Sequence, residues 1–217
     1  MENKESKEVK NFGYDLSLII KTFGIEVTEP NTILNDWLES HYELNDYEQM
    51  FFDELYADAK EDGGYWNEEE LKINFIGAAF RLAKINTKKR IKVFYERPLS
   101  GIVKGYPLSV ITDCLVATPL PFNTPDHPYF FLQEFKKRKG DKNDPEAQML
   151  VAMLIAQEIN KDDKPLFGGY LIGQNWNFTL FHNNTYCQSR QYDSTRQDDL
   201  LHIIFIIRKL KELILNR

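Results

Sequence analysis

The chain has 217 residues, of which 42% are hydrophobic and 13% aromatic, and its formal net charge is −6. This composition excludes wholesale disorder, and no apolar run approaches the roughly 18 residues that span a membrane. Two cysteines make no disulfide framework, and residues 1–10 are polar with no apolar signal-peptide core, so we expect a cytoplasmic protein.

The charge is unevenly placed. Residues 1–70 hold 19 acids and 5 bases, a net charge of −14, whereas residues 71–217 hold 14 acids and 22 bases, a net charge of +8. An acidic arm on a basic body is expected when the body binds a polyanion. The alternative is a charged surface that only keeps the protein dissolved.

The first part of the chain reads as helical. Apolar patterns predict short helices over 14–25, 33–41 and 46–60, and Asn67 with Glu70 forms a capping box that opens the next helix. We therefore predict an acidic helical N-terminal extension over residues 1–66. A core domain that ends in a helix would follow over residues 67–217.

Strand patterns dominate the next part. Runs rich in β-branched and aromatic residues predict strands, and a Pro-rich loop is predicted at 119–128. The predicted strands cover 91–95, 101–104, 108–118, 129–137, 165–172, 176–182 and 185–191. Asp144-Pro145 starts a buried helix to about residue 159, and a capping box at 194–197 starts a final helix to residue 215. The order predicts a mixed α/β or α+β domain.

Two acids and a lysine fall on neighbouring predicted strands. Asp113 interrupts an apolar run, and Glu134 and Lys136 stand two residues apart at the end of the next strand, where residues i and i+2 share a face. Carboxylates are ligands for Mg²⁺, and a nearby ammonium positions the attacking water or stabilises developing charge. The pattern predicts a metal-dependent phosphodiesterase. The alternative is an edge ion pair between Glu134 and Lys136, with Asp113 ending its strand at the surface.

This arrangement resembles the PD-(D/E)xK nuclease superfamily over about residues 67–190. The resemblance implies a restriction-endonuclease-like αβββαβ core, with a central mixed sheet flanked by helices. Asp113 matches the first Asp of the motif, and Glu134-Phe135-Lys136 matches its E-x-K half. It implies Asp113 and Glu134 as ligands of Mg²⁺ (or Mn²⁺) and Lys136 as a catalytic residue. Thr112 stands in place of the motif's Pro, a position that the family commonly relaxes.

Two further residues enter the predicted site through the same resemblance. Many members carry an acid in the helix before the first strand, and Glu68 matches that position. The alternative for Glu68 is a first-turn acid favoured by the helix dipole. A Gln in the later helix lies near the active site in the recombination-nuclease branch, which implies Gln148. The alternative for Gln148 is an exposed first turn.

A basic cluster follows the predicted catalytic strand and is expected to bind nucleic-acid phosphates. Its members are Lys137, Arg138, Lys139 and Lys142. The alternative is a solvated loop, and Lys88-Lys89-Arg90 shows the same ambiguity without a predicted site beside it.

The sequence therefore predicts a nuclease that hydrolyses phosphodiester bonds of nucleic acid, with DNA as the expected substrate. One alternative is a catalytically inactive nuclease-like scaffold that binds nucleic acid or protein. Another is an α+β domain in which the E-x-K is a coincidence. The acidic N-terminal helices are a candidate surface for a homodimer or a protein partner, and no membrane partner is expected.

Overall fold

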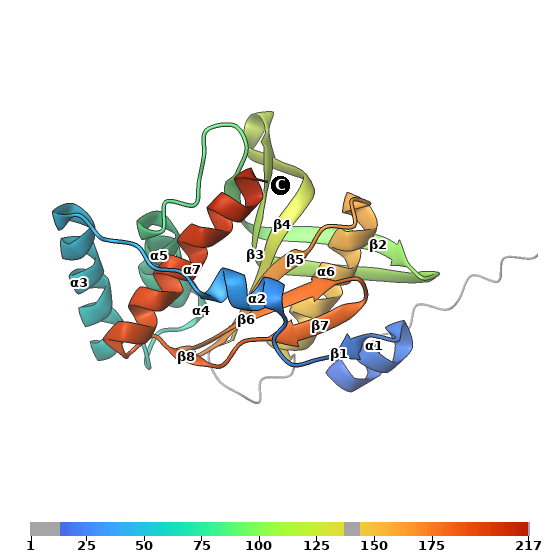
Figure 1. Cartoon of the computed structure of the whole chain (residues 1–217), viewed down its shortest axis with the longest axis horizontal. Coiled ribbons are helices and arrows are strands. Elements are labelled where there is room, and N and C mark those ends of the chain that lie inside the picture. Colours follow the sequence, from blue (N-terminus) through green and yellow to red (C-terminus); the bar gives the residue numbers. More distant parts are fainter. Residues whose placement is uncertain (1–13, 137–143, 217) are drawn as a thin grey trace, which may run out of the picture.

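A mixed β-sheet with helices on both faces forms the centre of the protein (Figure 1). The computed structural model describes residues 14–136 and 144–216, and for residues 131–134 and 136 it describes the backbone alone. Seven of the eight described strands follow the order β1-β7-β6-β5-β4-β3-β2, and β8 pairs with β6. The strands are β1 Glu26–Val27, β2 Lys92–Val103, β3 Tyr106–Leu120, β4 Thr124–Lys136, β5 Leu166–Ile172, β6 Asn175–His182, β7 Thr185–Gln188 and β8 Tyr192–Asp193.

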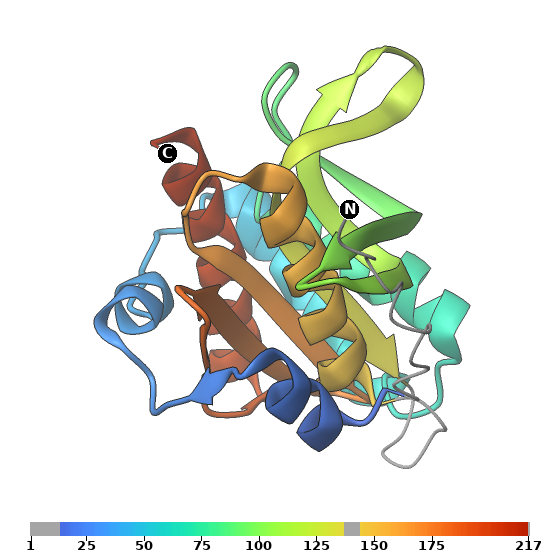
Figure 2. The same ribbon diagram turned by 90° about the vertical axis from the view of Figure 1, so that its right-hand side faces the viewer.

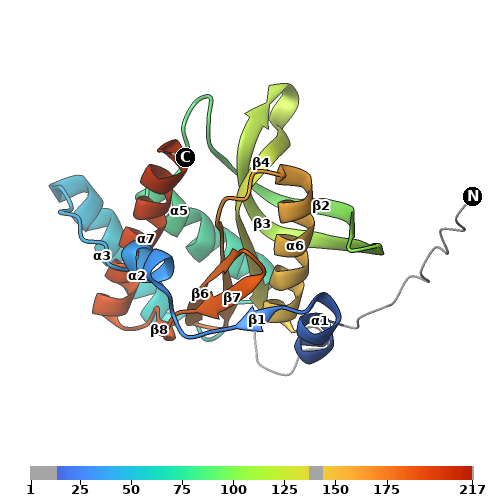
Figure 3. The same cartoon turned by 45° about the vertical axis from the view of Figure 1, so that its right-hand side comes forward.

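The helices form two layers, one on each face of the sheet. In Figure 2, α6 crosses the near face with α1 beside its lower end, and Figure 3 shows α3, α5 and α7 on the opposite side. The helices are α1 Leu16–Phe23, α2 Thr32–Leu38, α3 Asp46–Glu61, α4 Glu68–Glu70, α5 Gly77–Leu82, α6 Pro145–Asn160 and α7 Gln197–Leu215. Two buried clusters match the two layers, one joining α1 and α6 to the sheet and the other joining α2, α3, α5 and α7 to it. Among the described residues, no helix is long and apolar enough to cross a membrane.

The mixed α/β prediction is confirmed. Helical residues 68–82 precede the antiparallel meander β2-β3-β4, and α6 then connects β4 to β5, which pairs with it in parallel. A parallel pair needs a crossover connection, and α6 supplies it. Most side chains of α6 are alanines or other apolar residues and are buried. The helix packs against β2, β3, β4 and β5.

The strands of the meander are longer than predicted. β2 continues through Arg97 and Pro98, and β3 and β4 enclose a short 3-10 turn at Pro121–Asn123 in place of the predicted Pro-rich loop over 119–128. Proline ends a strand only where its missing N–H is needed by a neighbour. β2 is an edge strand. β4 pairs with β5 only from Phe131 onward, so the earlier part of β4 and the hairpin turn extend past the sheet (Figures 1 and 2). Both places therefore tolerate proline.

Two predicted helix starts are confirmed, and a third is wrong. Asn67 and Glu70 form a reciprocal capping box, and the side chain of Asp144 accepts the N–H of Glu146 at the start of α6. At α7 the N-cap is Arg196, which makes no side-chain cap. The predicted box fails there because the helix begins only at Gln197, and the hydroxyl of Ser194 donates to the carbonyl of Gln174 at 3.0 Å instead.

The N-terminal helices share the core of the sheet. Trp37 in α2 donates its indole N–H to the carbonyl of Ile206 in α7 at 2.9 Å, and Phe52 of α3 belongs to the same buried cluster. β1 adds a short parallel strand to β7, so residues before and after the predicted boundary at residue 66 contribute to one sheet and one core. The boundary itself stays a prediction.

Candidate active site

Asp113 lies where β3 and β4 separate. The two strands pair as far as Cys114 and Gln133, and the carboxylate of Asp113 then takes the place of the next ladder bond. Its Oδ2 accepts the backbone N–H of Phe135 at 2.8 Å, and the side chain is 13% exposed. Asp113 does not end its strand, because β3 runs on to Leu120. A partly buried acid thus holds two diverging strands together.

Glu134 and Lys136 flank this contact along the chain. Each stands beside Phe135 in β4, and their backbones pair with Tyr170 and Ile172 of β5. Asp113 is therefore hydrogen-bonded to the middle residue of the E-x-K sequence. The side chains of Glu134 and Lys136 lie outside the described part of the structure, so the roles of these two residues stay predictions.

Glu96 stands opposite Asp113 on β2 and was not singled out by the sequence. The ladder pairs Tyr95 with Cys114 and Arg97 with Thr112, which leaves Glu96 facing Asp113 between them. Its φ is 50°, a left-handed backbone conformation that costs a non-glycine residue of order 1–3 kcal/mol. Such strain gathers at functional sites, where the surrounding structure holds it in place.

Lys72 brings its ammonium group to these carboxylates from the helix that follows Asn67. Its Nζ contacts Glu96 closely, lies 3.3 Å from Glu69 and 3.7 Å from Asp113 Oδ1, and its side chain is 11% exposed. Burial by itself lowers the pKa of this lysine. The hydrogen bond to Glu96 and the charge of Asp113 outweigh burial and raise the pKa above its ordinary value. Lys72 is thus a fixed cation among three acids.

A π-helical segment places Lys72. Residues Leu71–Ile76 form wide turns, and the N–H of Gly77 donates to the carbonyl of Lys72, five residues earlier. A Cβ at position 77 would lie 3.3 Å from that same carbonyl, so Gly77 leaves the room that the wide turn needs. Single π turns are rare and recur at functional sites.

The other two predicted residues differ in burial. Gln148 is 8% exposed, which excludes the exposed-turn alternative, and its Oε1 has no hydrogen-bond partner in the part of the chain that the structure describes. Glu68 begins α4 and is partly exposed, while Glu70 serves the cap of Asn67. The predicted phosphate-binding residues Lys137, Arg138, Lys139 and Lys142 lie outside the described residues.

The carboxylates around Lys72 are ligands of the kind that Mg²⁺ prefers, because they offer oxygen atoms. The ammonium of Lys72 already lies among them as a cation. Among the described side chains there is no group of three or more His, Cys, Asp or Glu that converges as a metal site. The side chain of Glu134 lies outside the described part of the structure.

No protein-family model matches this chain, and no curated protein matches its sequence.

Proposed function

We propose that this protein is a metal-dependent nuclease that hydrolyses phosphodiester bonds, with DNA as its substrate. The observation that carries the proposal is the 2.8 Å hydrogen bond from the N–H of Phe135 to Asp113. It joins the acid of β3 to the centre of the Glu134-Phe135-Lys136 sequence on β4, the relationship that a D…E-x-K site requires.

The order of the elements supports the finer assignment of a restriction-endonuclease-like core. Helical residues 68–82, the meander β2-β3-β4, α6 and β5 follow the order αβββαβ, with β5 parallel to β4. Fold does not imply function, so this order supports the scaffold more strongly than the activity.

Asp113 and Glu134 are the proposed ligands of Mg²⁺ or Mn²⁺. Such an ion, when bound, activates water and neutralises charge on the phosphate. Glu96 is a further candidate ligand because it faces Asp113 across the β2–β3 ladder and shares Lys72 with it. In the protein without metal, Lys72 offsets the negative charge of these acids.

Lys136 is proposed to position the attacking water and to stabilise charge on the phosphoryl oxygens. Gln148 is proposed to orient a group at the site, since a buried amide oxygen without a partner is costly unless something uses it. Glu68 is the weakest member of the proposed set, because its place in the first turn of α4 also suits the helix dipole.

One observation favours the alternative of a catalytically inactive scaffold that binds nucleic acid or protein. Lys72 already pairs with Asp113 and Glu96, so these acids have a partner without any metal. A non-catalytic descendant of a nuclease would need such a partner to keep a cluster of acids stable.

The proposal is tested by incubating plasmid and linear DNA with the protein and Mg²⁺ or Mn²⁺, with EDTA as the metal-free control. Asp113→Asn should lower cleavage on the order of a hundredfold or more. The matched change Asp58→Asn, at an exposed position on α3, should leave cleavage intact. Calorimetry with Mn²⁺ on the same proteins reports metal binding separately. Cleavage that survives in Asp113→Asn would remove this site from the proposal, and wild-type protein that neither cuts nor binds metal would favour the inactive scaffold.

A further inference from the structure

Two open cavities follow one another along β2, the edge strand of the sheet. The first, of about 510 Å³, lies between α5 and β2 and is bordered by Gly77 and Tyr95. The second, of about 660 Å³, lies between the segment after α5 and the turn that joins β3 to β4. Asn86 lines both cavities, so the two are neighbours on the surface, and we call the pair the channel.

The lining of this channel is basic. Arg81 and Lys84 line the first cavity, and Lys88, Lys89 and Lys92 line the second, while none of the described residues that line either cavity is acidic. Lys84 is paired with Glu48 at 2.6 Å, which leaves four cations to set the local charge. A positive channel on a chain whose net charge is −6 favours a polyanion as its ligand.

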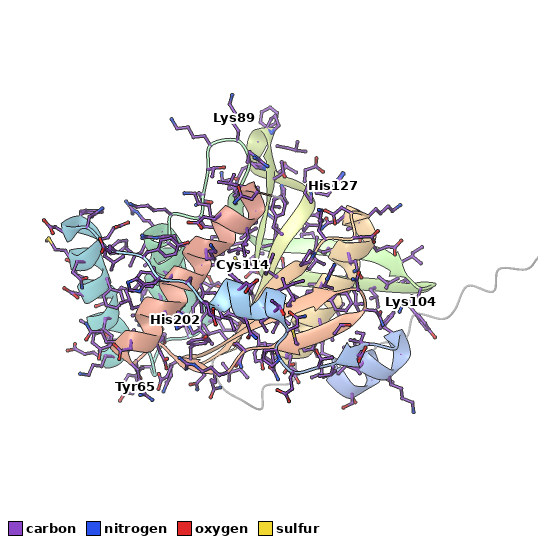
Figure 4. All side chains as sticks on the ribbon, in the orientation of Figure 1. Tyr65, Lys89, Lys104, Cys114, His127 and His202 are labelled. Carbon is purple, nitrogen blue, oxygen red and sulfur yellow. The ribbon has the colours of Figure 1, made fainter. Side chains whose placement is uncertain are left out.

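One end of the channel reaches the proposed active site. Tyr95 precedes Glu96 in β2 and pairs with Cys114, the neighbour of Asp113. In Figure 4, Cys114 lies near the centre of the molecule, and Lys89 stands at its upper edge beside the β3–β4 hairpin. From Asp113 to Leu120 the strand covers seven residues, or about 23 Å. A nucleic-acid strand covers that length with about seven nucleotides.

The far end of the channel carries an aromatic residue that the fold does not explain. Phe122 is 100% exposed, and its φ of 61° is followed by the same φ at Asn123. Consecutive left-handed residues in a hairpin turn favour Asn, Asp and Gly, and a bulky residue there is strained. Phe122 has this strain and no burial to offset it. A base that stacks on the ring would give the residue a role.

We propose that Arg81, Lys88, Lys89, Lys92 and Phe122 form a DNA-binding track. In this proposal the cations contact the phosphate backbone, and Phe122 stacks on a base or inserts between two bases at the end of the track. The identity of the ligand as DNA rests on the proposed function. The location of the track rests on the cavities, their charge and the exposed ring.

The track is tested by fluorescence anisotropy in EDTA, with labelled duplex and single-stranded DNA of roughly 20 nucleotides, which more than covers its length. The double variant Lys88→Ala/Lys89→Ala is compared with Lys21→Ala/Lys60→Ala, which removes two exposed lysines from α1 and α3. If both lysines of the track contact phosphates, the slope of log K against log salt should fall by about 1.8 for duplex DNA. Affinity should fall roughly tenfold or more, without dependence on sequence, and the control pair should bind as wild type does.

Phe122→Gly separates the fold from binding. Glycine adopts a φ of 61° without strain, so the variant should unfold at the same temperature as wild type or higher. Loss of one stacked base should weaken binding by about five- to a hundredfold, most clearly for single-stranded DNA. Unchanged binding in this variant would remove Phe122 from the track.

The outcomes distinguish this proposal from the proposed function. Wild-type protein that cuts DNA while Lys88→Ala/Lys89→Ala binds it unchanged would overturn the track and leave the nuclease. Binding that depends on these lysines in a protein that never cuts would support the track and reject the nuclease. Wild-type protein that binds no DNA would overturn the track.

Discussion

The carboxylate of Asp113 and the backbone N–H of Phe135 form the 2.8 Å bond that bridges β3 and β4 where the two strands part. Asp113 therefore has two roles: its negative charge belongs to the proposed metal site, and its Oδ2 accepts a backbone N–H from the neighbouring strand. Asp113→Asn keeps an acceptor for the N–H and should change the free energy of unfolding little. Asp113→Ala should lose about 1–3 kcal/mol, because a poorly exposed N–H is left without a partner.

Both variants should lose metal binding, and cleavage should fall on the order of a hundredfold or more. Urea unfolding and calorimetry with Mn²⁺ separate the two effects. Equal stability of the two variants would contradict the backbone role of Asp113.

Lys72→Met should destabilise the protein without metal by about 1–3 kcal/mol, because it leaves Glu96 and Asp113 facing each other without their ammonium. Mn²⁺ should then raise the unfolding temperature of the variant more than that of wild type, as the ion replaces the lost positive charge. Thermal unfolding with and without Mn²⁺ measures both effects, and Lys60→Met on exposed α3 is the matched control. An unfolding temperature of the variant that does not respond to metal would count against a cation site between these acids.

Glu48→Gln should cost about 3 kcal/mol at neutral pH. Glu48 is 4% exposed, lies 2.6 Å from Lys84 and 2.9 Å from Arg208, and so ties α3 to the end of α5 and to α7. Removing one partner of a buried ion pair leaves the other charge uncompensated. Urea unfolding measures the loss, and Glu54→Gln on the exposed side of α3 should have little effect.

The loss of stability in Glu48→Gln should depend on pH. Burial of Glu48 raises its pKa, but the hydrogen bond from Lys84 and the charge of Arg208 outweigh burial, and the net pKa lies below 4.5. The folded state therefore binds this proton less readily than the unfolded state, and the stabilisation is present above pH 4.5 and lost as the pH falls through the lowered pKa. The difference between wild type and Glu48→Gln should shrink in that acidic range.

Glu146 should show the opposite dependence on pH. Burial raises the pKa of this carboxyl above 4.5, and the hydrogen bond from the hydroxyl of Tyr186 at 2.9 Å only partly opposes the shift. The folded state holds the proton more tightly than the unfolded state, so this group lowers stability as the pH rises from 4.5 through the raised pKa. Glu146→Gln should raise the unfolding temperature at pH 7 and lose that advantage below pH 4.5, whereas exposed Glu158→Gln should do neither.

Gly168→Ala should lose about 1–3 kcal/mol, or several degrees in the unfolding temperature. A Cβ at this position of β5 would overlap Met153 Cε and lie 2.9 Å from Thr179 Oγ1 and 3.0 Å from Met149 Sδ of α6, so these buried side chains would have to shift. Calorimetry measures the shift. Gly64→Ala, with nothing within 4 Å, is the matched control and should be close to neutral.

Short-range signals account for most of what the sequence predicts correctly. The caps at Asn67 and Asp144 depend on residues two or three positions away, and the structure has both. The length of β2 and β3 depends on neighbours far along the chain, so Pro98 and the segment 119–128 misled the prediction. Whether a proline breaks a strand depends on which N–H groups need a partner, and the sequence does not state this.

Some residues of the candidate site could likewise be predicted from the sequence, and others could not. Asp113 could be singled out because an acid inside an apolar run is visible in the sequence, and Gln148 through the resemblance to the nuclease superfamily. Lys72 and Glu96 could not, since an ammonium in a π turn and a left-handed residue opposite Asp113 become apparent only with the register of β2 on β3. A positive φ at a glutamate has no signature in the sequence.

The pairing of β1 with β7 has a consequence for synthesis. Glu26 of β1 pairs with Thr185 of β7, so β1 has no strand to pair with until a residue 159 positions later (26 to 185) has been synthesised. At 5 to 20 residues per second, that interval lasts roughly 8 to 30 s on the ribosome. During this time the short strand has no ladder, and Glu26 and Glu29 give it the charge that discourages pairing with other chains. β1 is the first described strand to be synthesised, yet it can pair only after β7 has been made.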